Sequence, residues 1–85
     1  MAIGAIRALQ ESRVVVPDDV AVTGFDDILA ANFANPPLTT VAQDSRAAGA
    51  ALVDTLLRQI AKQPTQSTVL ATRLVVRRSC GAPAA

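Results

Sequence analysis

The segment Val20 to Phe25 is almost continuously apolar and follows the turn-forming residues Pro17-Asp18-Asp19. It does not alternate polar with apolar residues, as a strand with one solvent-facing side would. A continuous apolar run after a helix is typical of a parallel strand that is covered on both faces in an α/β sheet. Two or three strands cannot form such a sheet. The segment therefore predicts an incomplete α/β fold, a parallel sheet flanked by helices with neighbouring strands outside this chain.

The size of the chain leads to the same expectation. Domains of 85 residues bury only about 60 to 65% of their unfolded surface and often need disulfides, metals or partner subunits. The single Cys80 has no partner for a disulfide, and a zinc site normally uses several Cys and His ligands, whereas His is absent. Ala supplies 17 residues and adds little burial area. We expect a piece of a longer protein whose core is shared.

Hydrophobic periodicity predicts the main elements. Ile3, Ile6 and Leu9 recur at three-residue steps and indicate a helix from Ala2 to Glu11. The further expected elements are a short helix over 28–34 ended by Asn35-Pro36-Pro37, an extended segment 38–41, a long helix capped by Asp44 or Ser45 and running to about Lys62, a strand over 69–78 and a frayed tail over 81–85.

Charge and composition exclude several functions. The net charge is +1, from 8 Lys and Arg against 7 Asp and Glu, and it lacks the basic excess of a DNA-binding surface. No apolar run approaches 18 residues, and the N-terminus does not resemble a secretion signal, so we expect a cytoplasmic protein with no membrane partner. Without His, a nucleophile would have only Lys62 or a carboxylate as its base, and we interpret Cys80 as a small apolar filler. We expect neither catalysis nor a cofactor.

The pair Asp26-Asp27 is the main candidate for binding, because it follows the Val20–Phe25 strand at its carboxyl end, where ligands bind in open α/β sheets. A carboxylate there can accept hydrogen bonds from two vicinal hydroxyls. Alternatively, both aspartates cap the following helix; Asp27 is the better candidate for a cap and Asp26 for a ligand group. Further oxygen ligands are absent nearby, which argues against a metal. Gly24 indicates a close backbone approach or a strained turn.

Three arginines, Arg73, Arg77 and Arg78, lie in the last predicted strand. They could form a phosphate-binding patch. Arginines that alternate along an edge strand more often keep that edge solvated and block edge pairing. We favour this second interpretation.

Three ordered motifs make the chain recognisable: Val16-Pro17-Asp18-Asp19-Val20-Ala21-Val22-Thr23-Gly24-Phe25-Asp26-Asp27, then Pro36-Pro37-Leu38-Thr39-Thr40-Val41, then Leu74-Val75-Val76-Arg77-Arg78-Ser79-Cys80. From Met1 to Cys80 the chain resembles the C-terminal part of LacI/GalR-family transcriptional regulators. The resemblance implies a two-lobed, periplasmic-binding-protein-like core that binds a small effector, often a sugar, and a helix-turn-helix headpiece that lies outside this chain. Operator DNA would be bound only through that headpiece.

The resemblance also implies a division of the chain and roles for residues. Residues 1–35 would belong to the C-terminal lobe, 36–41 to an inter-lobe crossover, 42–63 to a helix on the N-terminal lobe, 64–80 to a returning strand, and 81–85 to a disordered tail. Asp26 would face the effector, and Ser45 is a weaker candidate there. The homodimer surface would include Leu29, Asn32 and Phe33, and the crossover would include Pro37, Leu38, Thr39 and Thr40.

One departure from the family concerns the end of the first helix, where members commonly have Gly and this chain has Ser12-Arg13. A left-handed helix end without Gly costs about 1 kcal/mol.

Two functions therefore remain from the sequence: the effector-sensing and dimerisation core of a LacI-type regulator, or part of a sugar-binding protein of a transport system with the same bilobed fold. In either case we expect that the isolated chain is not a stable monomer, because its apolar faces would lack their neighbours.

Overall fold

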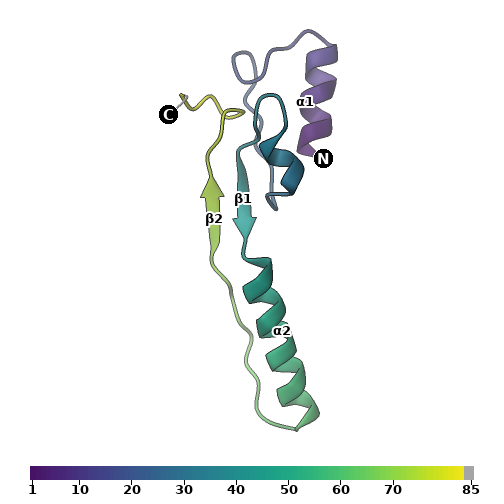
Figure 1. Ribbon diagram of the computed structural model, residues 1–85, viewed down its shortest axis with the longest axis vertical. Helices are drawn as coiled ribbons and strands as arrows, with labels where there is room; N and C mark the ends of the chain where they lie inside the picture. The colour runs from purple at the N-terminus through teal and green to yellow at the C-terminus, as the bar shows by residue number, and fades with distance from the viewer. Residues whose placement is uncertain (84–85) are drawn as a thin grey trace. The chain divides into compact units, whose positions relative to one another are not determined.

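The computed structural model describes residues 1–83, and Figure 1 shows its elements. In chain order they are the helix α1 (Ala2–Glu11), the 3-10 helix η1 (Leu29–Asn32), the strand β1 (Thr40–Gln43), the helix α2 (Ser45–Ile60) and the strand β2 (Thr72–Val75). The chain forms two compact units: Met1–Ala42 together with the segment that begins at Arg73, and Gln43–Thr72.

Helix α1 has the predicted bounds and buries Ile6. It ends in a Schellman motif, in which the Arg13 N–H donates to Gln10 O at 3.0 Å and the Val14 N–H donates to Leu9 O at 2.9 Å. Arg13 has a φ of 63°, in the left-handed region. The strained helix end that the sequence predicted is therefore present, and Arg13 occupies the position where Gly would avoid the cost.

The core of the first unit forms where α1 packs on the segments that follow it. Its buried apolar side chains are Ile6, Val16, Ala31 and Leu38. Gly24 lies so close to this cluster that an added Cβ would be 2.9 Å from Leu38 Cδ2 and 3.2 Å from Ala2 Cβ. The close backbone approach predicted at Gly24 is confirmed.

The segment predicted as the strand Val20–Phe25 is not a regular strand. It contains one isolated parallel bridge, between Thr23 and Thr39, with hydrogen bonds from Gly24 N to Thr39 O at 2.9 Å and from Asp26 N to Val41 O at 2.8 Å. The predicted parallel direction is correct at this bridge. A strand that is covered on both faces needs more neighbouring strands than residues 1–83 supply, so no regular ladder forms here. Phe25 at the end of the segment is accordingly exposed.

Two other elements are shorter than predicted. The helix expected over 28–34 is the four-residue η1, and the strand expected over 69–78 is regular only in β2. Strands β1 and β2 are hydrogen-bonded neighbours and run in opposite directions in Figure 1. Gly81 donates its N–H to Arg78 O at 3.1 Å; the last two residues of the predicted tail, 84–85, lie outside the described residues.

The second unit contains α2. Its N-cap is Asp44, whose carboxylate accepts from the Ala47 N–H at 2.9 Å, and this identifies which of the two predicted caps is used. The helix ends at Ile60, two residues before the predicted end, and Lys62 has a φ of 56°. None of its residues is buried. The exposed apolar residues are Leu52, Val53, Leu56, Leu57 and Ile60.

Candidate functional site

The site is built in the first unit from three segments, 22–27, 37–41 and 77–80. Ser79 joins them and is fully buried. Its hydroxyl donates to Val22 O at 2.5 Å and accepts from the Thr39 N–H at 2.9 Å, while the Val22 N–H donates to Ser79 O at 2.9 Å. One small side chain therefore connects all three segments.

Thr39 provides a second polar connection. Its buried hydroxyl accepts from the Arg77 N–H at 2.9 Å and donates to Cys80 Sγ at 3.1 Å. The Thr39 hydroxyl bond lowers the pKa of the Cys80 thiol. Cys80 is half-buried. The sequence interprets Cys80 as a small apolar filler, and it does not reveal the Thr39 hydroxyl that bonds to the sulfur.

An ion pair fixes the acidic turn. Arg77 Nη1 lies 2.8 Å from Asp27 Oδ1 and also donates to Leu38 O at 2.8 Å. The two side chains are only 15% and 22% exposed, so solvent screens this pair less than a surface pair. Two predictions were wrong here. Arg77 does not solvate an edge, because its guanidinium is engaged, and Asp27 does not cap η1, whose N-cap is Ile28 with no side-chain hydrogen bond.

Asp26 and Asp27 are two consecutive residues in the left-handed region, with φ values of 88° and 47°. Such non-Gly conformations cost about 1 to 3 kcal/mol each and concentrate at functional sites. The Asp26 N–H is held by Val41 O, and the Asp27 N–H donates to the hydroxyl of buried Thr40 at 3.3 Å. The result is a hydrogen-bonded turn that carries the exposed residue Asp26.

The remaining predicted residues fall in three places. Ser45 is exposed at the first turn of α2, in the second unit, whereas Asp26 is in the first. In and beside η1, Asn32 is exposed, and Leu29 and Phe33 are 75% and 79% exposed. Within the predicted crossover, Leu38, Thr39 and Thr40 are buried and Pro37 is half-buried.

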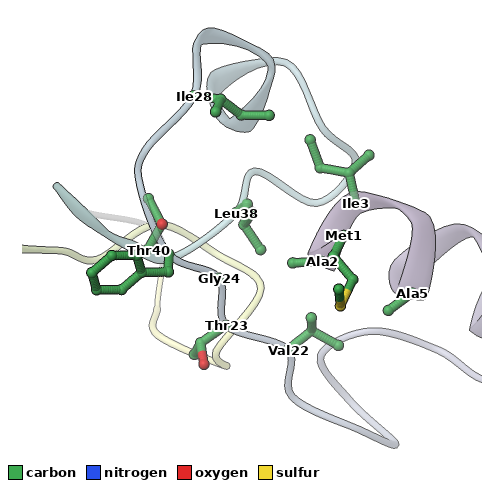
Figure 2. A pocket seen from close by; sticks show the side chains of 11 residues that line it. Met1, Ala2, Ile3, Ala5, Val22, Thr23, Gly24, Ile28, Leu38 and Thr40 are labelled. Carbon is green, nitrogen blue, oxygen red and sulfur yellow. The ribbon is translucent and has the colours of Figure 1, made fainter.

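A mostly apolar cavity of about 580 Å³ lies beside this site. Figure 2 shows Met1, Ala2 and Ile3 of the α1 region together with Val22, Gly24 and Leu38 around it. Sequence reasoning did not identify this cavity. Its one sequence signal was Gly24, which lets the backbone approach Leu38 closely and so shapes one wall.

Metal-binding and membrane-spanning features are absent from the part of the chain that the structure describes. Within residues 1–83, no three His, Cys, Asp or Glu side chains gather in a way that could hold a metal ion. No helix in that range has the length and apolar character needed to cross a membrane.

Ligand-binding α/β domains bind their ligands at the carboxyl ends of parallel strands, in largely apolar pockets. The acidic turn and the apolar cavity beside it place this chain in that class of domain. The chain belongs to the family of periplasmic binding protein-like domains, because the model of that family matches residues 1–80. The resemblance to LacI/GalR-family regulators and the α/β fold class drawn from the sequence are confirmed by this match and by the relatives below.

Three relatives describe the match. An uncharacterised helix-turn-helix-type transcriptional regulator from the aml 5′ region of Streptomyces limosus is 48% identical over 93% of this chain and 23% of its own length. The lac repressor dimer bound to operator and the anti-inducer ONPF superposes with a TM-score of 0.87, at 39% identity over 95% of this chain and 25% of that chain. A LacI-family regulator from Lactobacillus casei with bound sucrose has a TM-score of 0.77, at 42% identity over 92% of this chain and 29% of that chain.

The chain therefore spans about a quarter of the length of the relatives it matches. All three relatives are transcriptional regulators, so the alternative of a transport binding protein has less support.

Proposed function

We propose that this chain acts as the effector-sensing and dimerisation part of a LacI-type transcriptional regulator, with Asp26 as a ligand of the effector. The observation that carries the proposal is the hydrogen-bonded, left-handed turn that presents Asp26 at the carboxyl end of the segment bonded to β1. In a full-length regulator, closure of two lobes around the effector would shift the affinity for operator DNA.

The chemistry of Asp26 favours a polyhydroxylated effector. A carboxylate accepts hydrogen bonds from two adjacent hydroxyls and has no donor of its own at neutral pH, which suits a sugar. The sucrose bound to the Lactobacillus casei relative supports a sugar for this chain as well. The adjoining apolar cavity would contact the less polar face of a sugar ring.

Two further roles belong to the proposal. Residues 36–41 would cross between the lobes, and this crossover includes Pro37, Leu38, Thr39 and Thr40. Residues 1–35 and 64–80 would form part of the C-terminal lobe. Residues 42–63 would pack on the N-terminal lobe and place Ser45 near the effector. The module would perform no catalysis and would work in the cytoplasm, where operator DNA is reached through a helix-turn-helix outside this chain.

The effector role can be measured in a hybrid regulator, in which residues 1–80 replace the matching part of the Lactobacillus casei protein. The hybrid should bind sucrose in isothermal titration. Asp26→Asn should weaken sucrose binding by about 10- to 100-fold, because hydrogen bonds to a charged group contribute about 1.5 to 3 kcal/mol. The control is Asp18→Asn, which removes a carboxylate of the Pro17-Asp18-Asp19 turn, where Asp18 is exposed, and should change the affinity by less than about twofold.

An Asp26→Asn hybrid with unchanged affinity would remove Asp26 from the effector site. A folded hybrid that does not bind sucrose at all would contradict the proposal that residues 1–80 form part of an effector-binding core.

The dimer surface is proposed at η1, where Leu29 and Phe33 are apolar and exposed and Asn32 lies between them in the chain. Exposed apolar side chains next to each other mark interaction surfaces, and aromatic residues carry much of their binding energy. The dimeric state of the lac repressor relative supports this assignment.

Replacing both residues, Leu29→Ser with Phe33→Ser, should raise the dimer dissociation constant of the hybrid by at least about 100-fold, since truncated interface anchors cost about 2 kcal/mol or more each. Sedimentation equilibrium measures the change. The control is Val69→Ser at a residue that is 95% exposed, which should leave the dimer intact. A double variant that dimerises as tightly as the parent would show that η1 is not the interface.

A further inference from the structure

We propose that Arg77 is a positioning residue for effector binding: through its ion pair with Asp27 it holds the turn that presents Asp26. This inference rests on the proposed effector role of Asp26. It brings into the site a residue that lies 50 positions after Asp27 in the chain.

The geometry of Arg77 is that of a clamp between two segments. A single guanidinium nitrogen, Nη1, donates both to Asp27 Oδ1 and to Leu38 O, each at 2.8 Å. The backbone of Arg77 is itself held by the Thr39 hydroxyl at 2.9 Å. The backbone of Arg77 is therefore fixed by a buried residue, and its guanidinium connects the acidic turn to the segment that contains Leu38 and Thr39.

The turn needs such a clamp because its backbone is strained. Asp26 and Asp27 both have positive φ, and neither is Gly, so these conformations persist only where surrounding contacts impose them. The contacts that impose them include Asp26 N to Val41 O, Asp27 N to Thr40 Oγ1, and Asp27 Oδ1 to Arg77. The Arg77 contact is charge-assisted and largely shielded from solvent. Without it, the backbone turn that carries Asp26 would be held less firmly, and the Asp26 carboxylate would be less well positioned.

The positioning role makes a prediction that a general structural role does not. If Arg77 acts through Asp26, removing the clamp matters only while the Asp26 carboxylate is present. The two substitutions should then be non-additive in a double-mutant cycle. A loss of overall packing would instead lower affinity by the same factor in both backgrounds.

The experiment titrates sucrose into the hybrid regulator carrying Arg77→Met, Asp26→Asn or both. Arg77→Met should weaken binding at least about tenfold, as expected for losing a shielded charged pair. In the Asp26→Asn background, the same change should alter the affinity by less than about twofold. Asp27→Asn, which breaks the pair from the other side, should reproduce the Arg77→Met result. The matched control is Arg78→Met, next in the chain and exposed, with an expected change of less than about twofold.

The outcomes separate the two proposals. Unchanged affinity in Arg77→Met, with weakened binding in Asp26→Asn, overturns the clamp and leaves the effector role of Asp26 intact. Equal losses from Arg77→Met in both backgrounds also overturn it, in favour of a packing role. Unchanged affinity in Asp26→Asn overturns the proposed function on which the clamp rests. Should Arg77→Met fail to fold, Asp27→Asn, which keeps the arginine, tests the same clamp through the same cycle.

Discussion

The isolated 85-residue chain is expected to show no sharp, cooperative melting transition as a monomer. Within residues 1–83, the buried apolar side chains are few: Ile6, Val16, Ala31, Leu38 and Ala42. Helix α2 buries none of its residues, and its large apolar side chains are all exposed. An apolar core this small does not offset the conformational entropy of ordering a chain of this length.

The measurement is thermal unfolding followed by far-ultraviolet circular dichroism, together with analytical ultracentrifugation. We expect a broad, nearly linear loss of signal or a self-associated sample, because exposed apolar faces drive association. The hybrid regulator, in which residues 1–80 have neighbours, should melt cooperatively. As a control, Leu56→Gln with Ile60→Gln should reduce association of the isolated chain and leave its melt broad. A monodisperse monomer with a sharp melt would contradict the expectation.

Local sequence rules predicted the two α-helices well, but they predicted the short helix over 28–34 and the strands poorly. The bounds of α1 and the Asp44 cap of α2 follow from periodicity and capping within a few residues of the chain. The Val20–Phe25 segment and the ends of the predicted 69–78 strand depend on neighbouring strands instead. A strand becomes regular only when a ladder forms beside it, and residues 1–83 supply one bridge for the first segment.

Some residues of the candidate site could likewise be predicted from the sequence, and others could not. The sequence could identify the Asp26-Asp27 pair and Gly24, because their meaning follows from position along the chain. It could not show that Arg77 and Asp27, 50 residues apart, form an ion pair, so Arg77 was interpreted as an edge residue and Asp27 as a cap. Long-range polar contacts leave no periodic pattern in a single sequence.

Ser79→Ala should lower the stability of the hybrid regulator by about 2 to 4 kcal/mol, a large loss for a single substitution. The Ser79 hydroxyl is fully buried and serves two partners, Val22 O at 2.5 Å and the Thr39 N–H at 2.9 Å. Removing the hydroxyl leaves the Thr39 N–H without its acceptor and Val22 O without its donor. Each unpaired buried group costs about 1 to 3 kcal/mol. Because Ser79 and Thr39 are both buried, water cannot readily replace these bonds.

The midpoint of urea unfolding measures this loss, and Ser67→Ala is the matched control, since Ser67 is exposed and should change stability by less than about 0.5 kcal/mol. The Ser79→Cys variant tests the cause, because its thiol stands where the hydroxyl stood but is larger and only a weak donor and acceptor. Ser79→Cys should therefore recover little of the lost stability. If Ser79→Ala unfolds at the same urea concentration as the parent, the three segments are held by the backbone bonds and by Thr39 alone, and the hydroxyl of Ser79 is dispensable.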